Sequence, residues 1–293
     1  MNTKFALRAS PAPCATELAL HGLAYLAVGR HPASLFEPRY HAFARDAYGA
    51  DCCATLEEDG GVLGARMAQL DNTPLHALPA AIESTRALVA VARDPRAQVD
   101  GVHRATLDGC LARDPEGAEW LLCDLALCAR AFEARFESRV RPAIERACDE
   151  LEPALAEALA VAPDLARFRV SLTAALGERG RGFSPRWLLT GASGLWSPHT
   201  AEHSAVMILH EHAVSTAPSH EYLRAEWHAL VTLAHAIERS SLRDAHARWL
   251  ASLELTSLAL HAAREGLVDE AGARAIAEAR TDRADHLRSL SRG

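Results

Sequence analysis

Histidine residues are concentrated in one part of the sequence, since eight of the fifteen lie between His199 and His246. Imidazole side chains bind transition metals and exchange protons near neutral pH, so we expect the chemistry of the protein in this segment. On helical wheels of three successive predicted helices, one titratable residue in each faces the apolar side. These inward residues are His210, Glu226 and His246.

Three inward titratable residues on three helices predict a metal centre. A carboxylate buried without a partner is costly, so Glu226 should lie beside a cation or a strong hydrogen-bond donor. Two histidines and one carboxylate are the ligands of many non-haem iron sites and of zinc sites with an open position. Glu211, the neighbour of His210, would act as the catalytic base or as a further ligand. The expected cofactor is therefore zinc or iron.

A second histidine pair lies at the start of the same predicted helix. The segment His199-Thr200-Ala201-Glu202-His203 has the HxxEH pattern of the inverted zinc proteases. Residues four apart share one face of a helix, so His199 and His203 are secondary candidates for metal ligands. The remaining histidines of this region are expected at the surface: His212, His220, His228 and His235.

The segment from about residue 170 to 240 resembles the zincin metallopeptidases, because a strand precedes an apolar helix carrying His210-Glu211-His212-Ala213-Val214. Zincins use HExxH, in which two histidines bind zinc and the glutamate activates water. The resemblance implies a zincin-like C-terminal half, with His210 as a ligand and Glu211 as the base. Valine stands at position 214 in place of the second histidine, so the site would be a modified one.

The preferred hypothesis is a metal-dependent enzyme that acts on a peptide or small-molecule amide. Zinc would support hydrolysis, whereas non-haem iron would support oxidation of a peptide held against the edge of the predicted hairpin, a peptide modification suited to secondary metabolism. Val214 favours an alternative, a non-catalytic helical interaction or scaffold protein derived from such an enzyme. Metal-free acid–base catalysis by Glu211 and the histidines is a third possibility.

The charge composition argues against several other classes of protein. The net charge is -7 and aromatic residues make up 5% of the chain, so we expect no nucleic-acid partner. Lys4 is the only lysine, which leaves none for a pyridoxal-phosphate Schiff base or for a phosphate-binding loop. No apolar run is long enough to span a membrane, and Glu17 and His21 interrupt the apolar N-terminal segment, so we expect no signal peptide.

The cysteines indicate a reducing compartment. Their number is odd, no CxxC pattern occurs, and all of them precede residue 149: Cys14, Cys52, Cys53, Cys110, Cys123, Cys128 and Cys148. This spacing fits neither a disulfide framework nor a zinc knuckle. We therefore expect reduced, mostly buried thiols in a cytoplasmic protein.

Hydrophobic periodicity predicts a mainly helical protein with a small β-hairpin or sheet, in the α+β class. Helices are expected at 15–30, 35–48, 75–93, 97–112 and 117–162, the last broken or kinked at Pro142 and Pro153. Strands are expected at 169–173 and 186–190, followed by a helix starting at Ser197-Pro198 and helices at 219–239, 241–265 and 269–290. Residues 1–163 would form a helical domain, and 164–293 a hairpin-plus-helix domain with the active site; the two would pack separately or as one unit.

Overall fold

The computed structural model shows a mainly helical protein with one small sheet, which confirms the predicted class. It describes residues 7–12, 14–27, 39–54, 84–94, 112, 115–116, 123, 126, 129–130, 132–176, 180–183, 186–192, 194–196, 199–219, 221–279 and 281–290. In these ranges the buried apolar residues form one continuous core, with members from Leu7 to Leu287.

The sheet contains four strands in the order β1-β2-β4-β3. Their bounds are β1 (Ala9–Pro11), β2 (Arg169–Thr173), β3 (Gly180–Phe183) and β4 (Trp187–Gly191). The strands expected at 169–173 and 186–190 are therefore present, but they pair with each other in parallel. The antiparallel hairpin is made by β3 and β4 instead. The glycine-rich segment that forms β3 has no alternating apolar pattern, which is why the sequence did not predict this strand.

Strand β1 was not expected. It comes from the part of the chain before residue 163 and pairs with a strand from the part after it. It lies parallel to β2, with Ala9 opposite Val170 and Pro11 opposite Leu172. Pro11 lacks a backbone N–H and is tolerated because β1 is an edge strand. Residues 1–163 and 164–293 thus share one sheet.

The N-terminal part of the chain supplies helices around this sheet. They are α1 (Cys14–Ala27), α2 (Tyr40–Tyr48), α4 (Thr85–Arg93), the π-helical turn η3 (Phe136–Val140), α8 (Arg141–Val161) and the 3-10 turn η4 (Pro163–Arg167). They confirm parts of the helices expected at 15–30, 35–48, 75–93 and 117–162. The helix expected at 97–112 lies outside the described residues except for its last position.

Helix α8 contradicts the expected break at Pro153, because it runs through this residue without interruption. Pro142 follows the π-helical turn η3, and the chain is helical on both sides of it. Pro153 lies on the exposed side, as does Asp149, the residue whose carbonyl loses its helical donor. Water can bond that carbonyl, so the helix continues.

The C-terminal part contains more and shorter helices than expected. They are α9 (Ala201–Thr216), α10 (Tyr222–Ala236), α11 (Arg243–Ser252), α12 (Thr256–Arg264), α13 (Glu270–Glu278) and α14 (Arg283–Leu290). The predicted helices 241–265 and 269–290 are each two helices. Helix α11 ends at Ser252 because the buried Arg283 guanidinium donates to the carbonyl oxygens of Leu250 and Leu253, at 2.6 and 2.5 Å. The expected start at Ser197-Pro198 lies outside the described residues, and the helix begins at Ala201.

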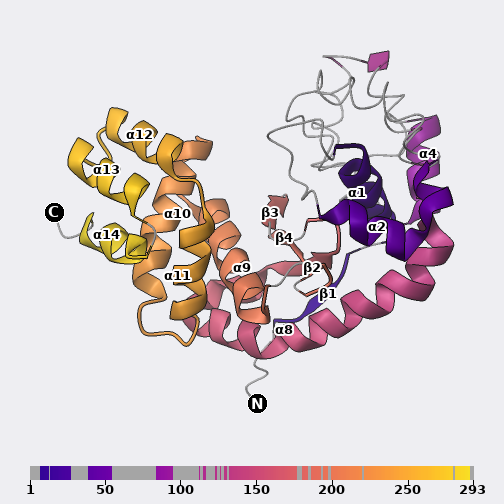
Figure 1. Cartoon of the computed structure of the whole chain (residues 1–293), viewed down its shortest axis with the longest axis horizontal. Helices are drawn as coiled ribbons and strands as arrows, with labels where there is room; N and C mark the ends of the chain where they lie inside the picture. The colour runs from indigo at the N-terminus through magenta and orange to yellow at the C-terminus, as the bar shows by residue number, and fades with distance from the viewer. Residues whose placement is uncertain are drawn as a thin grey trace.

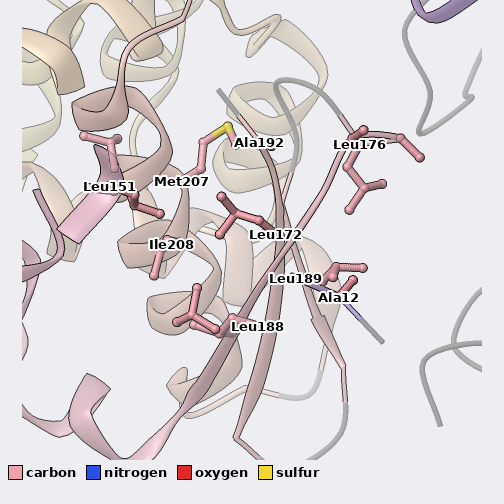
Figure 2. Close-up of a cluster of buried hydrophobic side chains, with 14 of the residues drawn as sticks. Ala12, Leu151, Leu172, Leu176, Leu188, Leu189, Ala192, Met207 and Ile208 are labelled. Atoms are coloured by element: carbon pink, nitrogen blue, oxygen red, sulfur yellow. The ribbon is translucent and has the colours of Figure 1, made fainter. Parts of the chain in front are cut away.

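Figure 1 shows how these elements are arranged around the sheet. The N-terminal helices α1, α2 and α4 lie on one side of it and helices α9 to α14 on the other, while α8 runs along the sheet and packs against β1 and α9. Leu172 and Leu188 of neighbouring strands point towards Met207 and Ile208 of α9, whereas Leu189 and Ala12 lie on the opposite face (Figure 2). The sheet therefore packs against α9 on one face, and this contact fixes the position of the histidine-bearing helix. Among the described helices, none is long and apolar enough to cross a membrane.

Candidate functional site

Helix α9 is enclosed by the rest of the protein, so its polar side chains are held in fixed surroundings. Every residue from His203 to His210 is buried. The helix packs against β3 and β4 on one side and against α8, α10 and α11 on the others. A helix with apolar residues nearly all round is expected to be buried in this way. Its polar residues must therefore find partners inside the protein.

The His210 imidazole lies between two carboxylates. Its Nε2 is 3.1 Å from Oε1 of Glu226 on α10, and its Nδ1 is 3.8 Å from Oε1 of Glu211. The Nε2 contact is short but is not aligned as a hydrogen bond, so it is an ion-pair contact. The two carboxylate side chains are 18% and 19% exposed, so both remain reachable from solvent. The sequence prediction that Glu226 pairs with a cationic partner is therefore confirmed.

These two carboxylates determine the charge of His210. Burial disfavours the imidazolium, but the close contacts with the Glu211 and Glu226 carboxylates outweigh it and raise the pKa of His210 from 6.5 to about 9. At neutral pH His210 is therefore a cation that can donate a proton.

His246 of α11 lies in the same cluster but has the opposite character. The Trp249 ring packs against both histidines, with its centroid 4.8 Å from that of the His210 ring and 5.9 Å from that of the His246 ring. His246 is buried, and its Nε2 has no hydrogen-bond partner among the described residues. Burial, together with the positive charges of His210 and Arg288, lowers the pKa of His246 to about 4. His246 is therefore neutral at physiological pH.

Glu211 connects this cluster to the edge of the sheet. Its Oε2 accepts a hydrogen bond of 3.0 Å from the backbone N–H of Gly182 in the edge strand β3. The close approach depends on glycine, since a Cβ on Gly180 would stand 2.7 Å from Cγ of Glu211. Glu211 thus holds β3 against α9, in addition to facing His210.

The expected metal centre is only partly assembled. The structure brings His210 and Glu226 together and places His246 nearby, but no three His, Cys, Asp or Glu side chains of the described residues form a group that could hold a metal. Both ring nitrogens of His210 face carboxylates, so neither presents a free lone pair to an ion. The arrangement does not fit zinc or iron as it stands. A metal centre at these residues stays a prediction, and it requires His210 to turn away from Glu226.

The secondary candidates His199 and His203 stack on each other, with ring centroids 3.9 Å apart. His199 precedes α9, so the two do not share a helix face as expected. Glu202 is exposed, and a hydrogen bond with Thr200 lowers the pKa of Glu202.

The expectation that His212 is at the surface is wrong. His212 is buried, its Nε2 is 3.2 Å from Asp164, and its ring packs edge-on against Phe168. Burial lowers the pKa of His212 even though Asp164 opposes the shift. His228 is exposed as expected, His235 is half-buried, and His220 lies outside the described residues.

Sequence reasoning missed a buried acid–base pair in α1. The Nε2 of His21 is 2.7 Å from Oε1 of Glu17, and both side chains are fully buried. The signal was present, since a glutamate and a histidine at i and i+4 interrupt an otherwise apolar helix. We interpreted these two residues only as evidence against a signal peptide.

Comparisons with protein-family models, with curated proteins and with solved structures found no match to this chain. The proposals below therefore rest on the residues and their geometry.

Substituting Gly180 by alanine tests the contact between β3 and Glu211. The added Cβ meets the Glu211 side chain, so we expect a loss of about 1–3 kcal/mol in the free energy of unfolding, measured by urea denaturation. In a Glu211→Ala background the obstacle is absent, and Gly180→Ala should cost much less. An equal cost in both backgrounds would show that the contact does not matter.

Proposed function

We propose that this protein is an enzyme whose active site is the cluster formed by His210, Glu226 and His246, and that it catalyses acid–base chemistry. His210 is the general acid, held as an imidazolium by Glu226 and Glu211. His246 is the general base. The observation that carries this proposal is the pair of histidines packed on Trp249. His210 lies beside two carboxylates, and His246 is buried with no hydrogen-bond partner for its Nε2 in the described structure.

An acid and a base in one site require two environments that shift the pKa values apart. The cluster has this property, because the pKa of His210 rises to about 9 while that of His246 falls to about 4. At neutral pH one histidine can donate a proton and the other can accept one. A substrate in contact with both histidines would receive a proton from His210 at one atom and lose one to His246 at another.

The neighbouring sheet edge favours a peptide or another amide as the substrate. Strand β3 is an edge strand. The Glu211 carboxylate accepts a hydrogen bond from the Gly182 N–H of this strand and also lies beside the His210 imidazole. An extended peptide added beside an edge strand is bound through its backbone. The amide groups of such a peptide would lie near the acid–base pair, although Gly182 itself is already bonded to Glu211.

Substitution combined with a substrate screen tests this function. Peptides and small amides are incubated with the full-length protein, and turnover is followed by mass spectrometry. His210→Gln and His246→Gln should each lower kcat by about 10²- to 10⁴-fold, the usual contribution of a general acid or base. His228→Gln, an exposed histidine of α10, is the matched control and should retain full activity. Retention of activity in both His210→Gln and His246→Gln would overturn the assignment.

The same variants separate the alternatives. If one equivalent of Zn²⁺ or Fe²⁺ is required for turnover and is lost in His210→Gln, the predicted metal centre replaces the metal-free mechanism. If no substrate is turned over and the substitutions alter only stability, the cluster is structural. That result would support the non-catalytic interaction or scaffold protein.

A further inference from the structure

A second buried polar cluster lies in the N-terminal half and plays no part in the proposed function. It consists of Glu17 and His21 of α1 with Tyr40 and Tyr48 of α2, all fully buried. The His21 ring stacks on Tyr40 at 5.4 Å and meets Tyr48 edge-on at 4.9 Å, between centroids. The Phe136 ring of the π-helical turn η3 lies 6.1 Å from the His21 ring. Four titratable side chains are thus held together by aromatic packing.

The cluster lies at the carboxyl ends of the parallel strands. The Ala174 backbone N–H, directly after β2, donates to Oε1 of Glu17 at 2.8 Å. The Trp196 indole, which follows β4, donates to the Ala174 carbonyl oxygen and packs 5.9 Å from the Tyr40 ring. Ligands of open parallel sheets bind at this edge, and π-helical turns are frequent at functional sites. The carboxyl edge of the parallel strands and the π-helical turn therefore both indicate a binding site at this cluster.

Several polar atoms of the cluster have no partner in the part of the chain that the structure describes. They belong to four side chains and are Oε2 of Glu17, both ring nitrogens of His21, and the hydroxyl oxygens of Tyr40 and Tyr48. Each unsatisfied buried group costs roughly 1–3 kcal/mol, and a whole domain is stable by only about 5–15 kcal/mol. Four side chains with unsatisfied polar atoms in one place indicate that a ligand binds among them.

The orientation of His21 indicates the chemistry of that ligand. Its Nε2 faces the Glu17 carboxylate, which itself is fixed by the Ala174 N–H. A histidine that donates one ring N–H to a carboxylate presents a lone pair at the other nitrogen, as metal-bound histidines do. The 2.7 Å contact of Nε2 with Glu17 is not aligned as a hydrogen bond, so both ring nitrogens of His21 lack a hydrogen-bond partner within the described ranges. Because Nε2 is in contact with the carboxylate, Nδ1 is the nitrogen left for a ligand. Carboxylate and phenolate oxygens are hard donors, so the complete set suits a hard cation that also accepts imidazole.

We propose that His21, Tyr40, Tyr48 and Glu17 form a buried binding site for a hard metal cation, with Fe³⁺ as the best match. The imidazole Nδ1 and the two phenol oxygens bind the ion, and the Glu17 carboxylate orients His21 or adds Oε2 as a ligand. A phenol binds a metal cation as its phenolate, so its proton must leave when the cation binds. Each phenol that binds therefore releases one proton to solvent.

Ferric titration of the full-length protein tests this site. Protein purified with a chelator is titrated with ferric nitrilotriacetate, and the visible tyrosinate-to-iron charge-transfer band is recorded. We expect the band to saturate at one equivalent and to be lost in Tyr48→Phe and in Tyr40→Phe. Tyr222→Phe is the matched control, since Tyr222 on α10 is 60% exposed and should leave the band unchanged. His210→Gln should also keep the band, because His210 belongs to the other cluster.

Thermal unfolding shows whether the variants fold. Without iron, Tyr48→Phe should be at least as stable as the natural protein, because it removes an unpartnered buried hydroxyl. Iron should raise the unfolding midpoint of the natural protein and of Tyr222→Phe, but not that of Tyr48→Phe. The proposal is overturned if the natural protein shows no band at excess iron, or if the Tyr40→Phe/Tyr48→Phe double variant keeps it. Neither outcome depends on the activity of the His210 cluster.

Discussion

The free energy of unfolding is expected to be greatest near pH 6.5, the ordinary pKa of histidine, and to fall on both sides. The folded-state pKa of His210 is raised to about 9, so its stabilisation is complete below pH 6.5 and is lost as the pH rises towards 9. The folded-state pKa of His246 is lowered to about 4, so stability is lost as the pH falls from 6.5 towards 4. Each change amounts to about 3 kcal/mol.

Urea denaturation at a series of pH values measures both changes. His210→Gln should remove the alkaline decrease relative to the natural protein, and His246→Gln the acidic decrease. His228→Gln is the control and should keep both, because this side chain is exposed. If the acidic decrease has the same size in His246→Gln as in the natural protein, His246 is not the neutral base that we propose.

Replacing Arg283 by methionine is expected to lower the free energy of unfolding by about 3–5 kcal/mol. The Arg283 side chain is 4% exposed and donates to the carbonyl oxygens of Leu250, Leu253 and Ile276, at the ends of α11 and α13. Methionine fills a similar volume but leaves these buried carbonyls without a charged donor. Because α11 carries His246, its release should also shift the His246 ring resonances.

Two further variants define the role of the guanidinium. Arg283→Lys keeps the charge but loses the planar fork that reaches several carbonyls, so its stability should be intermediate. Arg264→Met, at an exposed position in α12, should change stability by less than about 0.5 kcal/mol. A similar cost for Arg264→Met and Arg283→Met would show that the buried bonds of Arg283 are not the cause.

The sequence predicted helices and strands most accurately where the apolar periodicity extends over the whole element. Helices α9 and α10 and strands β2 and β4 lie within a few residues of the expected spans, and His210 meets Glu226 as the helical wheels indicated. Periodicity carries no information about which strand pairs with which, so the parallel pairing and β1 were missed. It also predicted one continuous helix over 241–265, whereas the chain forms two helices there, and Leu260 in the second of them is 53% exposed.

The errors at the site have long-range causes. Helix α11 ends where Arg283 donates to the Leu253 carbonyl, and Arg283 lies 30 residues further along the chain. The residues around Leu253 therefore carry no local signal that predicts this helix end. His212 is buried because Asp164, which belongs to the turn η4, pairs with it. Glu211 was expected to act as a base. Because β3 has glycine at positions 180 and 182, this edge strand lies close to Glu211, and its carboxylate accepts a hydrogen bond from Gly182. Each of these contacts depends on tertiary packing, which a helical wheel does not describe.

The pairing of β1 with β2 has a consequence for the order in which the chain folds. The Glu17 carboxylate bonds to the Ala174 backbone, 157 positions further along the chain, and Ala9 pairs with Val170. Contacts between such distant residues form slowly, because a long loop must close before any of them is made. During synthesis the first strand has no partner until β2 has left the ribosome. Until then it exposes an unpaired edge, so we expect the nascent N-terminal half to be the stage most prone to aggregation.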